Sequence, residues 1–351
     1  MAEIFRRHAF SITFLVILFG FVFFSGGDDE LVSLSGFTMG TTFQVQLVEI
    51  PPDMERETLA EEIGRLLARL DREIFSTYSA NSELSRLNRH AVGTPFLVSK
   101  EMMDVLVMAR EISLLTGAAF DVTVGPLVNL WGFGPEISLQ DQVPADAAIA
   151  SALENIGYQH LMIEQANSRV RKTRDISIDL SAIAKGYAVD KLAEYLDELG
   201  AESYFLEIGG ELKIKGLKPG DESWVPAIEA PVDQVSRVYE IFYSRGETIA
   251  VAGSGDYRNY FEQDGIRYSH EIDPRNGRPI SHNLAAVYVI DESTARADAL
   301  ATAYMILGLD QARALAQREN QAAYFIYKEG DDFSDYVTPA FQRYLGDQGN
   351  G

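Results

Sequence analysis

The chain of 351 residues contains no cysteine. This absence excludes thiol catalysis, iron–sulfur clusters and thiolate zinc sites, and it fits an oxidising compartment, where a free thiol is a liability. Histidine is scarce as well. Apart from His270 there are only His8, His90, His160 and His282, and these four lack the spacing of metal ligands. A zinc enzyme is therefore not expected.

Basic residues are few relative to acidic ones. The 30 Lys and Arg against 52 Asp and Glu give a formal net charge of −22. Because phosphate backbones are bound by Lys/Arg surfaces that release counterions, this balance argues against a nucleic-acid partner. The sequence also lacks a G-x-G-x-x-G or Walker pattern and any repeat of solenoid period. Rossmann and P-loop sites therefore receive little support.

The first 30 residues have the pattern of a targeting segment. Arg6 and Arg7 precede an apolar run over residues 9–24, and the sequence turns polar from Ser25. As a helix the run would be about 24 Å long, slightly short of a bilayer core. The positive-inside rule places the arginines in the cytoplasm and the remainder outside it. We expect an uncleaved signal-anchor first, a cleaved signal second and a buried core helix third; either of the first two exports the body to the periplasmic side of the inner membrane.

Residues 31–351 are predicted to form one large α/β (α+β) domain with mixed or antiparallel sheets and flanking helices. Helices and strands intermix without the strict alternation of a doubly wound sheet. Hydrophobic periodicity predicts helices over residues 58–75, 100–115 (capped by Ser99), 145–156, 294–307 and 311–319, and another that follows Ser181 and ends near Gly200. Strands are predicted at residues 43–47, 176–180, 204–208, 224–229, 238–242, 248–252, 257–262, 284–290 and 322–327.

Asp298 and Thr302 are four residues apart on a predicted helix, so both side chains project from one face. Small alanines surround them and leave room for a ligand. A carboxylate and a hydroxyl are hard oxygen ligands, which suit Mg²⁺ better than zinc. The same spacing is found for an ordinary helical Asp with a Thr that hydrogen-bonds to its own helical turn. On spacing alone, this interpretation without a metal is the stronger one.

His270 precedes a turn signal made of Asp273-Pro274 and Asn276-Gly277. This places His270 at the end of a strand. A histidine in this position can act as a general base near neutral pH. A surface strand histidine without a catalytic role explains the pattern equally well.

Lys185 lies in the first turn of the helix predicted after Ser181. A lysine there opposes the helix dipole and needs an anionic partner, which a bound phosphate would supply. Gly186 inside the helix indicates close packing by a ligand or a neighbouring element. The alternative is a surface lysine and a packing glycine. Gly-rich turns are also predicted at Gly209-Gly210 and at residues 253–256, each after a strand, where phosphates can approach the backbone.

Taken together, short motifs in one consistent order between residues 38 and 345 resemble the ApbE family, the FAD:protein FMN transferases once described as thiamine-biosynthesis lipoproteins. Single motifs are weak, but the ordered set is very specific. The matching segments are Thr38-Met39-Gly40-Thr41, residues 75–78 with 81–88, residues 117–127 with 131–134, residues 179–187, Gly209-Gly210, and residues 254–261, 269–279 and 297–301.

The resemblance implies transfer of FMN from FAD to a Thr or Ser hydroxyl of an acceptor protein, typically a membrane redox subunit, with release of AMP. In the family, Mg²⁺ is held by residues that correspond to Asp298, Thr302 and the backbone carbonyl of Ala182. His270 matches the histidine proposed as the base. The FAD contacts of the family correspond to Met39, Tyr78, Ala119, Phe120, Asp121, Asp179, Lys185 and Ile272. Many relatives are lipoproteins with a processed cysteine, so the resemblance does not extend to lipid anchoring here.

The chemistry of these residues agrees with that role. An acidic protein repels a pyrophosphate unless a metal such as Mg²⁺ neutralises its charge. A base such as His270 would activate a weakly nucleophilic hydroxyl, and Lys185 would stabilise charge on the phosphates. Two alternatives stay open. One is a Mg²⁺-dependent FAD pyrophosphatase that releases FMN and AMP, and the other is an exported flavin-binding protein without chemistry, which would not need His270, Asp298 and Thr302 together.

Overall fold

The computed structural model describes residues 31–134, 143–232, 237–257 and 259–346. The predicted N-terminal anchor or signal helix, residues 1–30, lies outside the described residues. Within the described ranges no helix is both long enough and apolar enough to cross a membrane.

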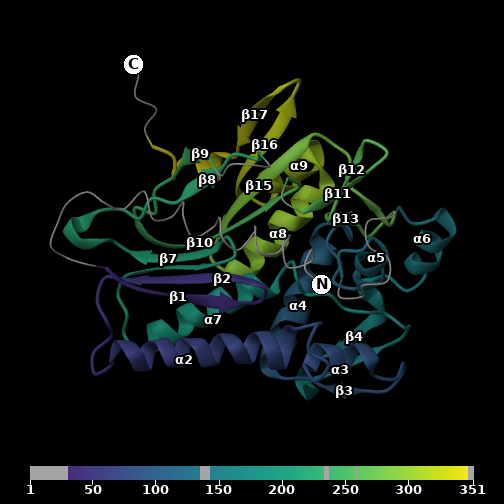
Figure 1. Ribbon diagram of the computed structural model, residues 1–351, viewed down its shortest axis with the longest axis horizontal. Coiled ribbons are helices and arrows are strands. Elements are labelled where there is room, and N and C mark those ends of the chain that lie inside the picture. Colours follow the sequence, from purple (N-terminus) through teal and green to yellow (C-terminus); the bar gives the residue numbers. More distant parts are fainter. Residues whose placement is uncertain (1–30, 135–142, 233–236, 258, 347–351) are drawn as a thin grey trace.

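An eight-stranded sheet forms the centre of the fold, and every neighbouring pair in it is antiparallel (Figure 1). Across the sheet the order is β1 (Val32–Thr38), β2 (Thr41–Leu47), β6 (Tyr204–Ile208), β7 (Glu211–Gly216), β10 (Gly246–Gly255), β15 (Leu284–Asp291), β16 (Ala322–Glu329) and β17 (Asp332–Val337). The predicted α+β class with antiparallel sheets is confirmed for this part of the chain.

Helices cover one face of this sheet. They are α2 (Arg56–Ala68), which continues into the π-helix η1 (Arg69–Phe75), α4 (Lys100–Leu115), α7 (Ala184–Glu198), α8 (Thr294–Leu307) and α9 (Leu309–Arg318). Figure 1 shows α2 and α7 running beneath β1 and β2. The buried residues of α2 recur every four positions, Leu59, Ile63 and Leu67, so one face of the helix packs into the main core. The helix-spaced pattern at residues 58–75 thus predicted this element correctly.

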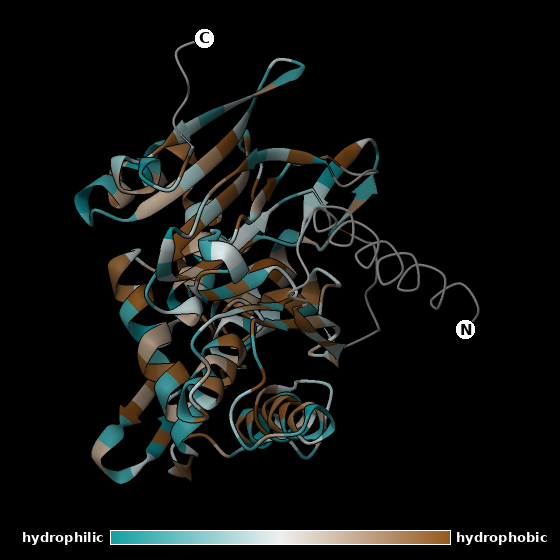
Figure 2. Ribbon diagram, turned by 90° about the vertical axis from the view of Figure 1, so that its left-hand side faces the viewer, coloured by the Kyte–Doolittle hydropathy of each residue, from teal (hydrophilic) through white to brown (hydrophobic). Residues whose placement is uncertain are grey.

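The opposite face of the sheet has its own apolar layer. Trp224, Phe242 and Phe341 are buried there, beside β8 (Ala227–Glu229), β9 (Val238–Ile241) and α10 (Pro339–Gln342). Because both faces are covered, all five residues of β6 are buried. Figure 2 shows hydrophobic and hydrophilic residues alternating along other strands of the fold.

Smaller elements surround the end of the sheet where the predicted site lies. They are α3 (Glu83–Arg89), α5 (Gly125–Leu130), α6 (Asp146–Leu153), the sheet of β3 (Phe96–Leu97), β4 (Leu161–Glu164) and β5 (Arg169–Lys172), the hairpins β11 (Tyr260–Gln263) with β12 (Ile266–Ser269) and β13 (Ile272–Asp273) with β14 (Arg278–Pro279), and the 3₁₀ turns η3 (Tyr158–His160) and η4 (Gln165–Asn167). The 3₁₀ turn η5 (Pro219–Asp221) follows the opposite end of β7. Trp131 joins the β13–β14 hairpin to β12. Its indole Nε1 donates to the carbonyl oxygen of Gly277 at 2.8 Å, and its ring stacks on Tyr268.

The strand predicted at residues 176–180 is wrong, and so is the N-cap assigned to Ser181. Ser177 forms only an isolated bridge with Val124, and α7 begins at Ala184 without a side-chain cap. Ile176 and Ile178 are each 1% exposed. The alternation that suggested a strand therefore reflects alternate burial of an extended loop and not pairing in a sheet.

The turn predicted at residues 253–256 is also wrong, because Gly253–Gly255 belong to β10. The glycines make room for aromatic rings. A Cβ on Gly253 would lie 2.8 Å from the ring of Tyr288, and one on Gly255 would lie 2.6 Å from that of Tyr257. Glycine inside a strand often marks such a close approach. The other predicted turn, Gly209-Gly210, is confirmed as the connection between β6 and β7.

Candidate active site

Two hairpin turns and the start of α7 meet at one end of the central sheet. A Cβ on Gly209 would lie 2.7 Å from Cγ2 of Thr41 and 3.4 Å from Cδ of Lys185. Met39 occupies the turn between β1 and β2 with a left-handed φ of 48°, and its N–H donates to Oδ2 of Asp71 at 3.2 Å. The structure therefore brings the Met39 turn, the Gly209 turn and Lys185 together, although they are far apart in the sequence.

Lys185 lies between two buried carboxylates. Its Nζ is 2.5 Å from Oε1 of Glu211 and 3.9 Å from Oδ1 of Asp298. Burial opposes the charged form of Lys185, but the two carboxylates outweigh it and raise the pKa of the lysine. The anionic partner that the sequence required is thus supplied, in this structure, by the protein itself.

Two further glutamates of this cluster escaped the sequence analysis. Glu207 accepts a hydrogen bond from the N–H of Gly210 at 2.7 Å, and burial raises the pKa of Glu207 to about 7. Burial also raises the pKa of Glu211, while Lys185 opposes this, and the 2.5 Å contact keeps the proton on the lysine. Oε2 of Glu211 is buried and has no hydrogen-bond partner among the described residues. The sequence feature that could have indicated these two glutamates is their position on either side of the Gly209-Gly210 turn.

α8 places Asp298 against the first turn of α7. Oδ2 of Asp298 accepts a hydrogen bond from the N–H of Gly186 at 3.1 Å. A Cβ on Gly186 would lie 2.4 Å from the carbonyl oxygen of Thr294, so the glycine allows α7 and α8 to touch. The close packing predicted at Gly186 comes from a neighbouring helix. Burial raises the pKa of Asp298, and the charge of Lys185 opposes that rise.

The loop that carries Asp179 and Ala182 is held from two sides. Asn88 donates through Nδ2 to the carbonyl of Ile178 at 2.8 Å and accepts from its N–H through Oδ1 at 2.7 Å. The N–H of Asp179 donates to the carbonyl of Val122 at 2.7 Å. The motifs at residues 81–88 and 117–127, which contain Asn88 and Val122, therefore hold this loop next to the start of α7.

Tyr78 presents an open aromatic surface beside this loop. The residue is 77% exposed. Desolvation of its hydroxyl and the negative charge of Asp179 both raise the pKa of Tyr78. An exposed ring in this position can stack against a planar ligand.

The segment Ala119-Phe120-Asp121 follows α4 and is buried. Asp121 accepts hydrogen bonds from the N–H and hydroxyl of Thr123, at 2.8 and 2.7 Å, and from the N–H of Tyr158 at 2.7 Å. Burial raises the pKa of Asp121. Its carboxylate thus organises its own loop, and the FAD contact expected at these three positions stays a prediction.

His270 directly follows β12, as the turn signal predicted. Its Nδ1 lies 3.0 Å from the carbonyl oxygen of Asn259, an acceptor that fixes Nδ1 as the donor. Nε2 is then the nitrogen without a proton in the neutral ring, and it lies 3.6 Å from Oε1 of Glu271. Ser254 donates to the same Glu271 oxygen at 2.6 Å, and the charge of Glu271 also acts on Lys185. Ile272 is buried in β13.

The oxygen donors expected to hold a metal fit a hard cation. Asp298 contributes a carboxylate, Thr302 on the same helix a half-buried hydroxyl, and Ala182 a backbone carbonyl. Among the described residues Oδ1 of Asp298 accepts no hydrogen bond, and the ammonium of Lys185 lies 3.9 Å from it, so this oxygen retains acceptor capacity. Within the described part of the chain no three His, Cys, Asp or Glu side chains form a metal-binding group. The expected ligand set would not form such a group, because it combines one carboxylate with a hydroxyl and a backbone carbonyl.

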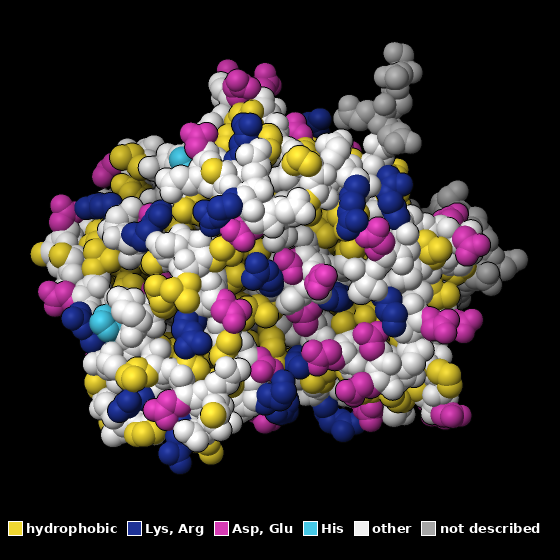
Figure 3. All heavy atoms as spheres, turned by 180° about the vertical axis from the view of Figure 1, so that it is seen from behind, with side chains coloured by type: hydrophobic (Ala, Val, Ile, Leu, Met, Phe, Trp, Pro, Cys, Tyr) yellow, Lys and Arg dark blue, Asp and Glu magenta, His cyan; other side chains and the backbone are white. Residues whose placement is uncertain are grey.

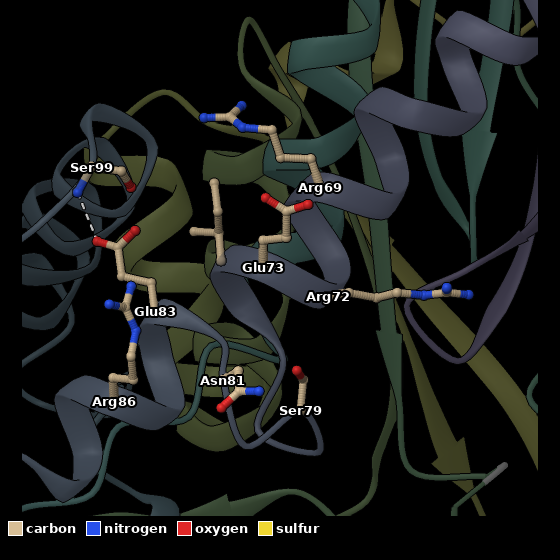
Figure 4. A pocket seen from close by; sticks show the side chains of 9 residues that line it. Arg69, Arg72, Glu73, Ser79, Asn81, Glu83, Arg86 and Ser99 are labelled. Atoms are coloured by element: carbon tan, nitrogen blue, oxygen red, sulfur yellow. Dashed lines mark hydrogen bonds between the residues drawn. The ribbon is translucent and has the colours of Figure 1, made fainter.

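A separate cleft of about 500 Å³ opens between η1 and α3, next to the loop of Tyr78 (Figure 4). It is lined by Arg69, Arg72, Glu73, Ile74, Ser79, Asn81, Glu83, Arg86 and Ser99. Its three arginines are matched by its two glutamates and by Glu101, which pairs with Arg69 at 2.7 Å. Acidic and basic groups are likewise interspersed over the rear face of the molecule in Figure 3. The cleft therefore has no net charge that favours an anion, and none of the predicted site residues lines it.

The fold and this site define an α+β protein whose central antiparallel sheet differs from the parallel sheet of a Rossmann fold. A hairpin turn of the antiparallel sheet presents acidic residues beside the N-terminus of α7, which carries Lys185, and α8 adds Asp298. The sequence profile of the ApbE family matches residues 39–326. The chain belongs to the ApbE family.

Individual relatives agree over almost the whole chain. The FAD:protein FMN transferase of Vibrio cholerae serotype O1 is 45% identical over 317 residues, which cover 90% of this chain and 93% of the relative. That of Escherichia coli K12 is 36% identical over 355 residues, covering 97% and 99%. Among solved structures, the flavin transferase ApbE from Vibrio cholerae has a TM-score of 0.82 at 43% identity, covering 90% of this chain and 99% of that one. The apo flavinyl transferase ApbE from Pseudomonas stutzeri has a TM-score of 0.82 at 41% identity, covering 91% and 98%.

Proposed function

We propose that this chain transfers FMN from FAD to a Thr or Ser hydroxyl of an acceptor protein and releases AMP. Family membership and the names of the relatives support the flavin transfer. The structural observation that carries the proposal is the position of Lys185 beside Asp298, at the turns where Met39 and Gly209 also lie. This arrangement offers an ammonium group and a metal-binding carboxylate to one pyrophosphate.

In the transfer, the acceptor hydroxyl oxygen forms a bond to the phosphorus of the FMN moiety while the pyrophosphate P–O bond to AMP breaks. When bound by Asp298, Thr302 and the carbonyl of Ala182, Mg²⁺ would supply positive charge that neutralises the pyrophosphate. His270 takes the hydroxyl proton on Nε2, the nitrogen that the Asn259 contact leaves unprotonated. Lys185 stabilises charge on the phosphates.

The remaining predicted contacts bind FAD. Tyr78 offers its exposed ring for stacking. The full set in this role is Met39, Tyr78, Ala119, Phe120, Asp121, Asp179, Lys185 and Ile272. The flavin ring is the group transferred and performs no redox step here.

The N-terminal segment is assigned to the membrane in the same proposal. Arg6 and Arg7 before the apolar run of residues 9–24 support an anchor with the catalytic domain on the periplasmic side of the inner membrane. An acceptor that is a membrane redox subunit would then present its flavinylation site on the same side as the enzyme.

The test uses the full-length chain in detergent with FAD, Mg²⁺ and a Thr-containing acceptor domain of a membrane flavoprotein. The intact mass of the acceptor is recorded with and without EDTA, and with an Asp298→Ala variant. The proposal expects a gain of one phosphoester-linked FMN that EDTA and the substitution abolish. Free FMN and AMP without a gain on the acceptor would identify a pyrophosphatase instead. FAD that stays bound and intact would identify a passive flavin-binding protein.

A further inference from the structure

Lys185 is a built-in competitor for any cation at Asp298. Its ammonium lies 3.9 Å from Oδ1 of Asp298, the oxygen that the Gly186 hydrogen bond to Oδ2 leaves unused. The attraction between opposite charges grows as the distance falls. An ammonium that moved into contact with this carboxylate would take the place that the proposed metal ion needs.

Glu211 holds the lysine back. Its Oε1 is 2.5 Å from Nζ of Lys185, which is 1.4 Å closer than Asp298 (3.9 minus 2.5). Glu211 is the first residue of β7 and pairs with Ile208 across the hairpin, so its backbone is fixed. Only 3% of its side chain is exposed. The carboxylate therefore cannot follow the lysine towards Asp298 without disturbing the turn.

We propose that Glu211 is a positioning residue that keeps the Lys185 ammonium off Asp298 and so leaves Oδ1 of Asp298 open to a divalent cation. The inference rests on the metal site in the proposed function, and it adds a residue that lies outside the expected ligand set of Asp298, Thr302 and Ala182. Without the charge of Glu211, the nearest carboxylate for Lys185 is Asp298.

Glu207 provides a matched control from the same hairpin. It is buried, and it acts on Lys185 only through its charge, because its Oε1 is engaged by the N–H of Gly210. Gln at position 207 retains that hydrogen bond. Glu271 also acts on Lys185 by charge alone and is engaged by Ser254. Glu211 differs from both in its direct contact with the ammonium.

The experiment measures Mg²⁺ binding to the full-length chain in detergent by isothermal titration calorimetry, without FAD or acceptor. Glu211→Gln is expected to weaken Mg²⁺ binding by roughly 10- to 100-fold, the range found for residues that support metal ligands indirectly. Glu207→Gln is expected to change it by less than about threefold. Circular dichroism checks that each variant is folded.

A double-mutant cycle with Lys185→Met separates positioning from simple charge. In the native background the lysine is already held away, so Lys185→Met removes only the repulsion of a charge 3.9 Å from Oδ1 of Asp298 and should raise Mg²⁺ affinity by less than about tenfold. In the Glu211→Gln background the same substitution removes the competitor and should restore at least about tenfold. Effects that simply add would show that Glu211 acts only as a distant charge and would overturn the inference.

Glu211→Asp keeps the test decisive if Glu211→Gln does not fold. The shorter acid retains the charge at the turn, so Mg²⁺ affinity should fall by less than about tenfold. A loss of about 100-fold or more in this variant would contradict the positioning role. Failure of the native chain to bind Mg²⁺ at all would instead refute the metal site of the proposed function, which is a distinguishable result.

Discussion

The backbone N–H of Gly186 donates to Oδ2 of Asp298 at 3.1 Å and so joins the first turn of α7 to α8. The two helices can approach this closely because Gly186 has no side chain, and its missing Cβ would lie 2.4 Å from the carbonyl oxygen of Thr294. The direction in which Asp298 points thus depends on a glycine 112 residues away in the sequence.

Gly186→Ala should separate α7 from α8 and turn Asp298 away from the site. Overpacking of this kind destabilises a protein by about 1–3 kcal/mol. We expect that loss in urea unfolding and a parallel loss of flavin transfer. The control is Gly64→Ala in α2, where a new Cβ meets nothing within 4 Å and should stabilise the helix by about 0.5–1 kcal/mol. Equal stability of the two variants would contradict the tight contact.

Glu207 should make stability depend on pH. Burial raises its pKa from 4.5 to about 7 in the folded protein. Because the folded value exceeds the unfolded one, its protonation contributes stability that is complete below pH 4.5 and is lost as the pH rises through about 7. The difference between 4.5 and about 7 corresponds to about 3 kcal/mol at most. Glu207→Gln, compared with the native chain in urea unfolding, should therefore gain relative stability between pH 5 and pH 8, and a constant difference would exclude this role.

His270→Ala should slow transfer without weakening FAD binding. The neighbours Asn259, Glu271 and Phe133 hold the His270 ring in place. A general base that is positioned in this way contributes about 10²- to 10⁴-fold to a rate. Single-turnover flavinylation measures the chemical step, and fluorescence quenching of the flavin measures binding. Unchanged transfer by the variant would remove His270 from the mechanism.

Asn88→Ala should release the loop that carries Asp179. The substitution leaves both the N–H and the carbonyl of Ile178 without their partner. An unsatisfied buried backbone group costs about 1–3 kcal/mol, so we expect a loss of about 2 kcal/mol in unfolding free energy. FAD affinity should fall as well, because the released loop carries Asp179, one of the proposed FAD contacts. A loss of stability with undiminished FAD affinity would show that the loop does not form part of the binding site.

Elements that carry their own local signals were predictable from the sequence. Residues 100–115 form a helix with the predicted bounds, and Ser99 caps it by accepting from the N–H of Met102 at 3.2 Å. α8 also has the predicted bounds, so Asp298 and Thr302 lie where the sequence placed them. Periodicity and capping are properties of neighbouring residues, which explains why they are readable without the fold.

The parts that failed depend on contacts between distant residues. The loop at residues 176–180 alternates like a strand, but its partners are the side chain of Asn88 and the carbonyl of Val122. Gly253 suggested a turn because glycine is common in turns. Its actual role, making room for the ring of Tyr288, depends on a residue that is distant in the sequence. The burial of Glu207 and Glu211 is likewise a tertiary property, so two acids of the cluster were missed.

The antiparallel sheet also makes the site depend on segments that are far apart in the sequence. β1 and β2 form a local hairpin, but Leu47 of β2 pairs with Tyr204 of β6, so the chain between them must first be brought into a closed loop. Asp298 follows much later still and reaches Gly186 only when α8 docks. Folds dominated by such long-range contacts form slowly. The active site is thus complete only when segments from the whole length of the chain have come together, because Gly186, Glu211 and Asp298 come from three separate elements.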